Sequence, residues 1–349
     1  FARNGLNDVR RAAERLKAML AAEEPLLFPL ERIVFTRRNP TVFSIFTKTE
    51  LERIQKTRRI HERGEVCNIN VDYTRLLGVG LLAKMRELVA RRDEFAKNGE
   101  QEKADYLAAD YEILNAVLAL SDRYRKLAEA EGRMDVADTL AWVPRYAPRT
   151  FPEALQMFRI LHFTMWLGGN YHNTLGRLDQ YMHPYYKADI DAGRLTKEAA
   201  LEWLEEFFIT FNRDSDLYPG MQQGDNGQSL MLGGCDRDGK SAVNPLTTLC
   251  LKASLHNRRI DPKINLRVNK DTPLELYELC TQLTRQGLGF PQYANDDVVI
   301  PALIQMGYAP EDARNYVVAA CWEFIIPGVA MDIPNIGAVS LAGVVAGVI

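Results

Sequence analysis

Apolar residues recur at helical spacing through the first part of the chain. Leu6, Val9 and Leu16 follow a three-to-four-residue period, and residues 113–127 repeat it. Side chains three and four positions apart share one face of a helix, so this pattern predicts helices whose apolar stripes build a core.

A segment punctuated by prolines, residues 143–152, follows this helical part. Each proline disfavours helix in the residue before it, so the segment predicts a boundary near residue 150. We therefore expect a helical part over residues 1–150 and a second part over residues 151–349.

Helix and strand patterns alternate beyond residue 150. Thr196 precedes an apolar helical stripe as an N-cap, and residues 272–275, Thr-Pro-Leu-Glu, have the sequence of a capping box with proline at the first helical position. Between these two helix starts, residues 263–269 alternate polar and apolar side chains, which is typical of a strand. The alternation predicts a mixed α/β fold with helices outside a sheet or barrel.

Composition narrows the classes of function. The chain has 349 residues, 47% of them hydrophobic, and a formal charge of −3, so no basic field for nucleic acid is expected. Residues 336–349 form the longest apolar stretch and are too few to span a bilayer. Because the chain starts at Phe1 and ends inside that stretch, we expect it to be a piece of a longer polypeptide.

Five cysteines show no CxxC pair and no metal-ligand spacing. The odd count and this spacing argue against a disulfide framework and against a bound metal, and they predict a cytoplasmic protein with reduced thiols. Free cysteines usually fill space in a core, and we assign Cys67, Cys250 and Cys280 to that role.

Residues 320–323, Ala-Cys-Trp-Glu, differ because they place a thiol and a carboxylate two positions apart in an apolar run. In extended backbone, Cys321 and Glu323 would project to the same side while Trp322 points away. A carboxylate buried in such a run is costly unless it is hydrogen-bonded or functional. The pattern predicts a thiol and an acid/base group in one pocket, at a strand end or on a loop.

Three polar, glycine-containing segments are further candidates for a binding site. Residues 168–181 offer His172 and Asn173, with a solvated loop and a structural ion pair between Arg177 and Asp179 as the alternative.

The other two segments are residues 218–228 and residues 289–297. The first offers Gln222 and Asp225, although its Asp-Asn-Gly is also an ordinary turn sequence. The second offers Tyr293, although Asn295 and Asp297 have the alternative role of capping the next helix.

Five stretches together resemble one known family: residues 142–151, 175–181, 227–234, 295–302 and above all 320–323. Their order and spacing are similar to those of the glycyl radical enzymes, which include pyruvate formate-lyase and related dehydratases and lyases. The resemblance implies a ten-stranded β/α barrel of two antiparallel five-stranded half-barrels, surrounded by helices, with the cysteine on a loop inside. It also implies a glycyl radical, a radical-SAM activating enzyme that installs it, a small-molecule substrate and a homodimer.

Carried over to this chain, the resemblance puts Cys321 at the thiyl position and Glu323 at the acid/base position. His172 and Asn173 fall where related dehydratases bind substrate, and Gln222 to Asp225 fall near another pocket-lining region. Ala320 stands where pyruvate formate-lyase has a first cysteine, which disfavours acyl transfer.

The expected function is therefore an elimination in anaerobic metabolism, catalysed by a dehydratase-type lyase. The alternatives are an arylacetate-type decarboxylase, a formate C-acetyltransferase-like enzyme and an inactive truncated homologue. The C-terminal domain with the radical glycine is absent from this chain, so the chain by itself is expected to be inactive.

Overall fold

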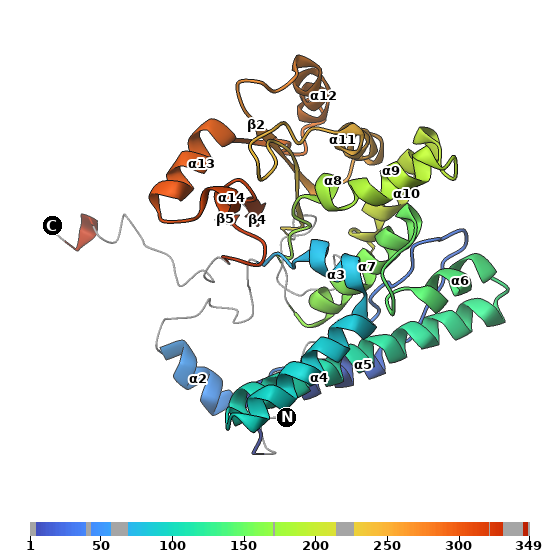
Figure 1. Ribbon diagram of the computed structural model, residues 1–349, viewed down its shortest axis with the longest axis vertical. Coiled ribbons are helices and arrows are strands. Elements are labelled where there is room, and N and C mark those ends of the chain that lie inside the picture. Colours follow the sequence, from blue (N-terminus) through green and yellow to red (C-terminus); the bar gives the residue numbers. More distant parts are fainter. Residues whose placement is uncertain are drawn as a thin grey trace.

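The structure is a computed structural model that describes residues 5–39, 43–56, 69–169, 172–213, 227–320, 322–330 and 345–347. Helices make up its first part: α1 (Asp8–Ala22), α2 (Lys48–Lys56), α3 (Tyr73–Val79), α4 (Leu81–Lys97), α5 (Gln101–Ala130), α6 (Met134–Trp142) and α7 (Phe151–Leu167). Helices α4 and α5 pack side by side, and α1 packs on α5 (Figure 1). The two predicted apolar stripes thus lie on α1 and α5.

Strands alternate with helices in the second part, as the sequence predicted. The elements after α7 are α8 (Leu178–Tyr181), α9 (His183–Asp191), α10 (Lys197–Thr210), β1 (Ser229–Gly233), α11 (Pro245–Asn257), β2 (Lys263–Val268), α12 (Leu274–Thr284), β3 (Gln292–Asn295), α13 (Asp296–Gln305), α14 (Pro310–Ala313), β4 (Val317–Ala319) and β5 (Glu323–Ile325). The chain is a helix-rich α/β protein.

Local sequence explains where several helices begin. The Thr196 hydroxyl accepts a hydrogen bond from the Ala199 backbone N at 3.1 Å, so the predicted N-cap of α10 is confirmed. The Asn295 side chain caps α13 in the same way. The capping box predicted at α12 is wrong: its N-cap is Pro273, and the Thr272 hydroxyl instead accepts from the Asn269 backbone N at 2.8 Å.

Strands β1, β2 and β3 form a parallel sheet in that order, with α11 and α12 as the crossovers. Isolated parallel bridges, Ile69 to Asn173 and Gly176 to Leu230, extend this pairing beyond β1. Strands β4 and β5 form a separate antiparallel hairpin, with Ala319 paired to Glu323.

The sheet is covered on both faces. Ile264 and Leu266 of β2 belong to the main core beneath the helices, whereas Arg267 on the opposite face donates to the Arg314 carbonyl just before the hairpin at 2.8 Å. All residues of β2 are therefore buried, including the polar half of its predicted alternation. Two-sided burial is typical of parallel sheets.

One apolar core joins the first and second parts of the chain. It extends from Met19 of α1 to Phe290 before β3, and α7 is buried along most of its length within it. A smaller cluster under the hairpin includes Met231, Ala294 and Val318. Helix α7 packs against α1 and α3 of the first part and against α9 and α10 of the second part, so it joins the two parts.

Candidate active site

Glu323 opens strand β5, and residues 320–322 connect this strand to β4. Its carboxylate accepts a hydrogen bond from the Trp322 backbone N at 2.9 Å, and the Trp322 side chain is 53% exposed. The predicted position of Glu323 at a strand end is therefore observed. The premise that this carboxylate is buried in an apolar run is wrong, since Glu323 is only half-buried.

Cys321 lies outside the described residues, but its neighbour Ala320 lies close to two distant segments. A Cβ added to Gly227 would come within 3.1 Å of the Ala320 Cα and would overlap the His172 ring. Residues 172, 227 and 320 therefore converge at the loop that carries the cysteine. The predicted candidate His172 is at this convergence.

All three residues have left-handed backbone, with φ of 67° at His172, 65° at Gly227 and 48° at Ala320. Side chains rarely adopt this conformation, and it is tolerated where the surrounding structure holds it in place. Strain of this kind gathers at functional sites, and here it affects His172 and Ala320, which are far apart in sequence, whereas glycine adopts this conformation without strain.

Two hydroxyl side chains fasten the hairpin to the sheet below this convergence. The Thr174 hydroxyl lies 2.7 Å from the Ser229 carbonyl oxygen and 2.9 Å from the Val318 carbonyl oxygen, and the Ser229 hydroxyl donates to the Ala320 carbonyl at 3.0 Å. Sequence reasoning did not identify Thr174 or Ser229. The available signal was that Thr174 lies within the polar segment 168–181 and Ser229 within the stretch 227–234, both already singled out.

The structure does not bring Asn173 to the same place as His172. Successive residues of an extended segment point to opposite faces, and the Thr174 hydroxyl points to the hairpin. Asn173 is fully buried on the other side, next to His162 of α7, and neither polar atom of its side chain has a partner among the described residues.

Of the remaining predicted substrate-binding residues, only Tyr293 lies in the part of the chain that the structure describes. Tyr293 shares the helix-facing side of the sheet with its register partner Leu266 and stacks on Tyr277 of α12, so the structure does not bring it to the hairpin. Gln222 and Asp225 lie outside the described residues.

Arg177 and Asp179 are buried, so the solvated loop considered as an alternative is wrong. The Asp179 carboxylate accepts from the Gly233 backbone N at 2.8 Å and from the Thr247 hydroxyl at 2.7 Å. Burial nevertheless raises the pKa of Asp179, because desolvation outweighs these hydrogen bonds. Both residues hold the end of β1 in place.

The predicted packing role of Cys250 and Cys280 is confirmed, because both thiols are buried and free. Burial raises the pKa of Cys280 to about 12 and that of Cys250 well above its usual value. Neither is suited to ionise. Cys67 lies outside the described residues.

Two further surveys concern only the described part of the chain. Within it, no three His, Cys, Asp or Glu side chains are grouped so that they could hold a metal ion. The helices described in these ranges include none that is both long and apolar enough to cross a membrane.

Curated proteins similar to this chain include two dehydratases. It is 31% identical over 297 residues to (2S)-3-sulfopropanediol dehydratase of Klebsiella oxytoca, covering 79% of this chain and 36% of that protein. It is 28% identical over 287 residues to trans-4-hydroxy-L-proline dehydratase of Clostridioides difficile, covering 73% and 35%. The chain therefore spans about a third of the length of these relatives.

Solved structures show the same fold. The B12-independent glycerol dehydratase from Clostridium butyricum, in its glycerol-bound form, superposes with a TM-score of 0.78 at 24% identity, covering 93% of this chain and 50% of that one. The model of the pyruvate formate lyase-like family matches residues 9–349. That match takes in the helical part, the parallel sheet and the hairpin, and the chain belongs to the pyruvate formate lyase-like family.

Proposed function

We propose that the full-length protein is a glycyl radical lyase of the dehydratase type. Cys321 abstracts a hydrogen atom from a small polar substrate, and Glu323 transfers a proton while water or another leaving group departs. The observation that carries this proposal is the convergence of His172, Gly227 and Ala320 at the cysteine loop, with Glu323 at the loop's far end. The two dehydratases named above support it.

The reaction needs a hydrogen-atom abstractor and a proton acceptor on neighbouring positions. Cys321 takes the hydrogen atom from a carbon that bears a hydroxyl, and Glu323 takes the proton of that hydroxyl. The bond from the adjacent carbon to its leaving group then breaks while a second acid gives the leaving group a proton, and Cys321 returns the hydrogen atom to the adjacent carbon. Placing the groups together contributes more here than a large shift of any pKa.

His172 is suited to bind a substrate hydroxyl, because its ring lies beside the loop at Ala320. We assign Asn173 a supporting position behind His172, since it is buried on the α7 side. Ala320 argues against acyl transfer, which would need two adjacent thiols. The roles of Gln222, Asp225 and Tyr293 remain predictions from the sequence.

The chemistry at the loop fits a glycyl radical, because a thiol hydrogen atom is what a carbon radical can abstract. That radical, on a glycine of the full-length protein, would supply the unpaired electron, and a radical-SAM activating enzyme would install it. We propose a homodimer, as in the resemblance, with a helical part over residues 1–150 and a barrel part over residues 151–349.

We further propose that the parallel pairing is one half of a ten-stranded barrel. The extended segments at Ile69 and at residues 173–176 would precede β1, β2 and β3 as the first two of five strands. The remainder of the full-length protein would supply the second half-barrel, arranged antiparallel to the first.

Replacing the thiol in the full-length protein tests this function. After anaerobic activation, Cys321→Ser should abolish turnover while the glycyl radical signal persists in electron paramagnetic resonance, because serine cannot relay the hydrogen atom. The matched variant Cys250→Ser replaces a buried thiol that only packs in the core. The folded fraction of this variant should keep both its glycyl radical and its turnover. Turnover by Cys321→Ser would exclude the proposed mechanism.

A substrate panel separates elimination from decarboxylation. Diols, amino alcohols, hydroxylated sulfonates and arylacetates would be offered to the activated enzyme, and products would be identified by mass. Release of water, amine or sulfite supports the lyase. If the enzyme instead released carbon dioxide from the arylacetates and consumed no other substrate, the protein would be a decarboxylase rather than a lyase.

A further inference from the structure

A polar cavity of about 330 Å³ lies at the opposite end of strand β4 from Ala320. Its walls come from the start of α3, from α8 and from the base of the β4–β5 hairpin, where Asn315 and Pro327 line it. The volume is in the range of small-molecule pockets, about 300–1,000 Å³. This cavity is separate from the cysteine loop, because β4 leads away from it toward Ala320.

Arg177 is the buried charge of this cavity, with only 6% of its surface exposed. Its Nη2 atom donates to the carbonyl oxygens of Gly233 at 3.1 Å and Cys235 at 2.7 Å. Its Nη1 atom makes only a long contact of 3.4 Å with the Arg314 carbonyl oxygen, and its Nε atom, which is fully buried, has no hydrogen-bond partner among the described residues. A buried guanidinium whose hydrogen bonds all go to neutral carbonyls is poorly compensated.

Nearby charges compensate Arg177 only in part. Burial, and next the nearby positive charge of Arg267, lower the pKa of Arg177 to about 10. The carboxylates of Asp179 and Asp296 act in the other direction but more weakly, and both already bond to other donors. An anion in the cavity beside the Arg177 guanidinium would therefore be favourable.

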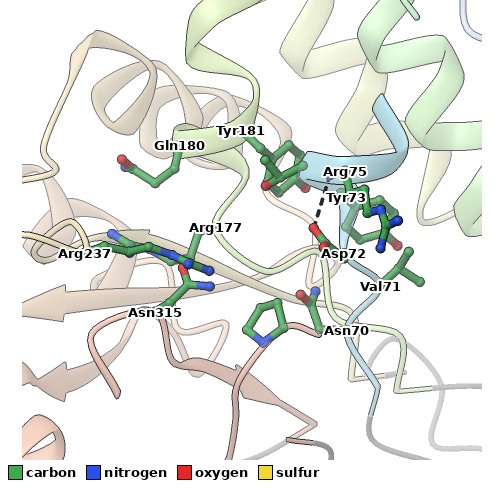
Figure 2. Close-up of a pocket in the computed structure, with 12 residues that line it drawn as sticks. Asn70, Val71, Asp72, Tyr73, Arg75, Arg177, Gln180, Tyr181, Arg237 and Asn315 are labelled. Atoms are coloured by element: carbon green, nitrogen blue, oxygen red, sulfur yellow. Dashed lines mark hydrogen bonds between the residues drawn. The ribbon is translucent and has the colours of Figure 1, made fainter. Parts of the chain in front are cut away.

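Arg237 adds a second guanidinium to the same wall. Its side chain is exposed and has no hydrogen bond or ion pair among the described residues, while its carbonyl accepts from Arg314 Nη1 at 3.0 Å. Figure 2 shows Arg237 and Asn315 on the same side of the cavity as Arg177. Two guanidiniums and an amide thus face one space.

The other charges of the cavity are already engaged. Arg75 donates to Glu87 at 2.8 Å, and Asp72 caps α3 by accepting from the Arg75 backbone N at 3.1 Å. Across the cavity from the arginines, Figure 2 shows Asp72 together with Asn70. Tyr73 also lines the cavity, but its hydroxyl is fully buried and does not face it.

We propose that this cavity binds a small hydroxylated phosphate monoester. Its phosphate lies between the guanidiniums of Arg177 and Arg237, and its hydroxyls face Asp72 and Asn70. Guanidinium forks match phosphate oxygens in geometry and charge, which makes arginine the common residue at such sites. The cavity is larger than a lone phosphate requires, and the acceptors opposite the arginines favour an organic part that bears hydroxyls.

Isothermal titration calorimetry on the full-length protein, without activation, tests this proposal at constant ionic strength. Glycerol 3-phosphate and inorganic phosphate are the probes. We expect saturable binding of glycerol 3-phosphate, at least several-fold tighter than that of inorganic phosphate. Arg237→Ala should weaken it by about tenfold or more, because a charge-assisted contact is lost. Arg237 is exposed, so this variant should fold.

Arg285→Ala is the matched control, because Arg285 is an exposed arginine at the end of α12. It should leave the affinity for glycerol 3-phosphate unchanged. The proposal is overturned if neither probe gives saturable binding, or if Arg237→Ala and Arg285→Ala weaken binding equally. Inorganic phosphate binding as tightly as glycerol 3-phosphate would overturn the assignment to a monoester. The measurement does not depend on turnover, so its outcome is independent of the proposed lyase activity.

Discussion

At the scale of single residues, Glu323 can be tested without disturbing the hairpin. Glutamine has the same shape and keeps an acceptor for the Trp322 backbone N, but it cannot exchange a proton at working pH. Glu323→Gln should therefore fold normally and lower kcat by about 10²–10⁴-fold, the usual contribution of a positioned acid or base. Turnover per glycyl radical, after anaerobic activation, measures this.

Glu278→Gln provides the comparison for Glu323→Gln, because Glu278 is an exposed carboxylate on α12. Its activity should match that of the unmodified protein. If Glu323→Gln retained turnover within about threefold of this control, Glu323 would have no role in proton transfer.

Gly227 tests whether the convergence at the cysteine loop matters. A Cβ at this position would overlap the His172 ring and press on Ala320, in addition to the strain of a φ of 65°. Gly193 has a φ of 68° with nothing within 4 Å, so Gly193→Ala isolates the backbone effect. We expect Gly193→Ala to cost about 1 kcal/mol of unfolding free energy and Gly227→Ala about 1–3 kcal/mol more.

Chemical denaturation measures the unfolding free energies of both glycine variants, and their turnover is then compared. Gly227→Ala should reduce activity because it displaces His172 or Ala320, whereas Gly193→Ala should leave activity unchanged. Equal losses of stability and activity in the two variants would show that the contact between these segments has no functional role.

At the scale of elements, the sequence predicted those features that depend on neighbouring residues. The apolar stripes of α1 and α5, the cap at Thr196 and the cap at Asn295 all follow from side chains within a few positions of each other. The capping box predicted at residues 272–275 does not form, because the Thr272 hydroxyl instead accepts a hydrogen bond from the Asn269 backbone N.

Strand pairing was harder to predict, because it joins residues far apart in the chain. Residues 173–176 have the composition of a loop, yet Gly176 bridges to Leu230 and Thr174 bonds across to Ser229 and Val318. Their extended conformation is fixed by these distant partners rather than by local propensity. The convergence of His172 with Ala320 follows from this pairing.

A buried ion pair links β2, α13 and the residue before β4. Asp296 accepts from Arg267 Nε at 2.7 Å and Nη2 at 2.9 Å, from the Tyr316 hydroxyl at 2.8 Å and from the Cys235 backbone N at 3.0 Å. Asp296→Asn replaces an acceptor by a donor facing Arg267, which leaves a buried cation uncompensated. We expect a loss of about 3–5 kcal/mol in unfolding free energy.

Lys187→Gln is the comparison for Asp296→Asn, because Lys187 forms an exposed pair with Asp191 on α9. Such surface pairs contribute about 0–1 kcal/mol. The denaturant midpoints of the two variants measure how much stability each substitution removes. A loss for Asp296→Asn no larger than that for Lys187→Gln would mean that the pair does not hold the three elements together.

At the scale of the whole molecule, the sequence indicated a boundary near residue 150 but not how the two parts meet. The residues of α7 are almost continuously apolar, and this pattern does not reveal which neighbours cover each face. The structure shows α7 packed against α1 and α3 from the first part and α9 and α10 from the second. A helix buried on all sides is predictable from its composition, whereas its role in joining two parts of the chain is not.

His162 lies at the centre of that packing and gives the whole molecule a dependence on pH. Its ring is fully buried between Phe158, Trp166 and Phe211, beside the backbone of Asn173. Burial, and next the positive charge of Arg159, lower the pKa of His162 well below its ordinary value of 6.5. The folded state therefore keeps this ring neutral, while the unfolded state protonates it near pH 6.5.

The sign of the effect follows from this difference. Above pH 6.5 neither state protonates His162 and its contribution to stability is complete; below pH 6.5 only the unfolded state takes up the proton, so stability falls by up to about 1.4 kcal/mol per pH unit. His162→Phe keeps an aromatic ring in the cluster and removes the titration. Denaturation at about pH 7.5, 6.5 and 5.5 should therefore show a shallower loss of stability in the variant than in the unmodified protein, since only His162 distinguishes them. The same slope in both would mean that the core opens to solvent around His162 before the molecule unfolds.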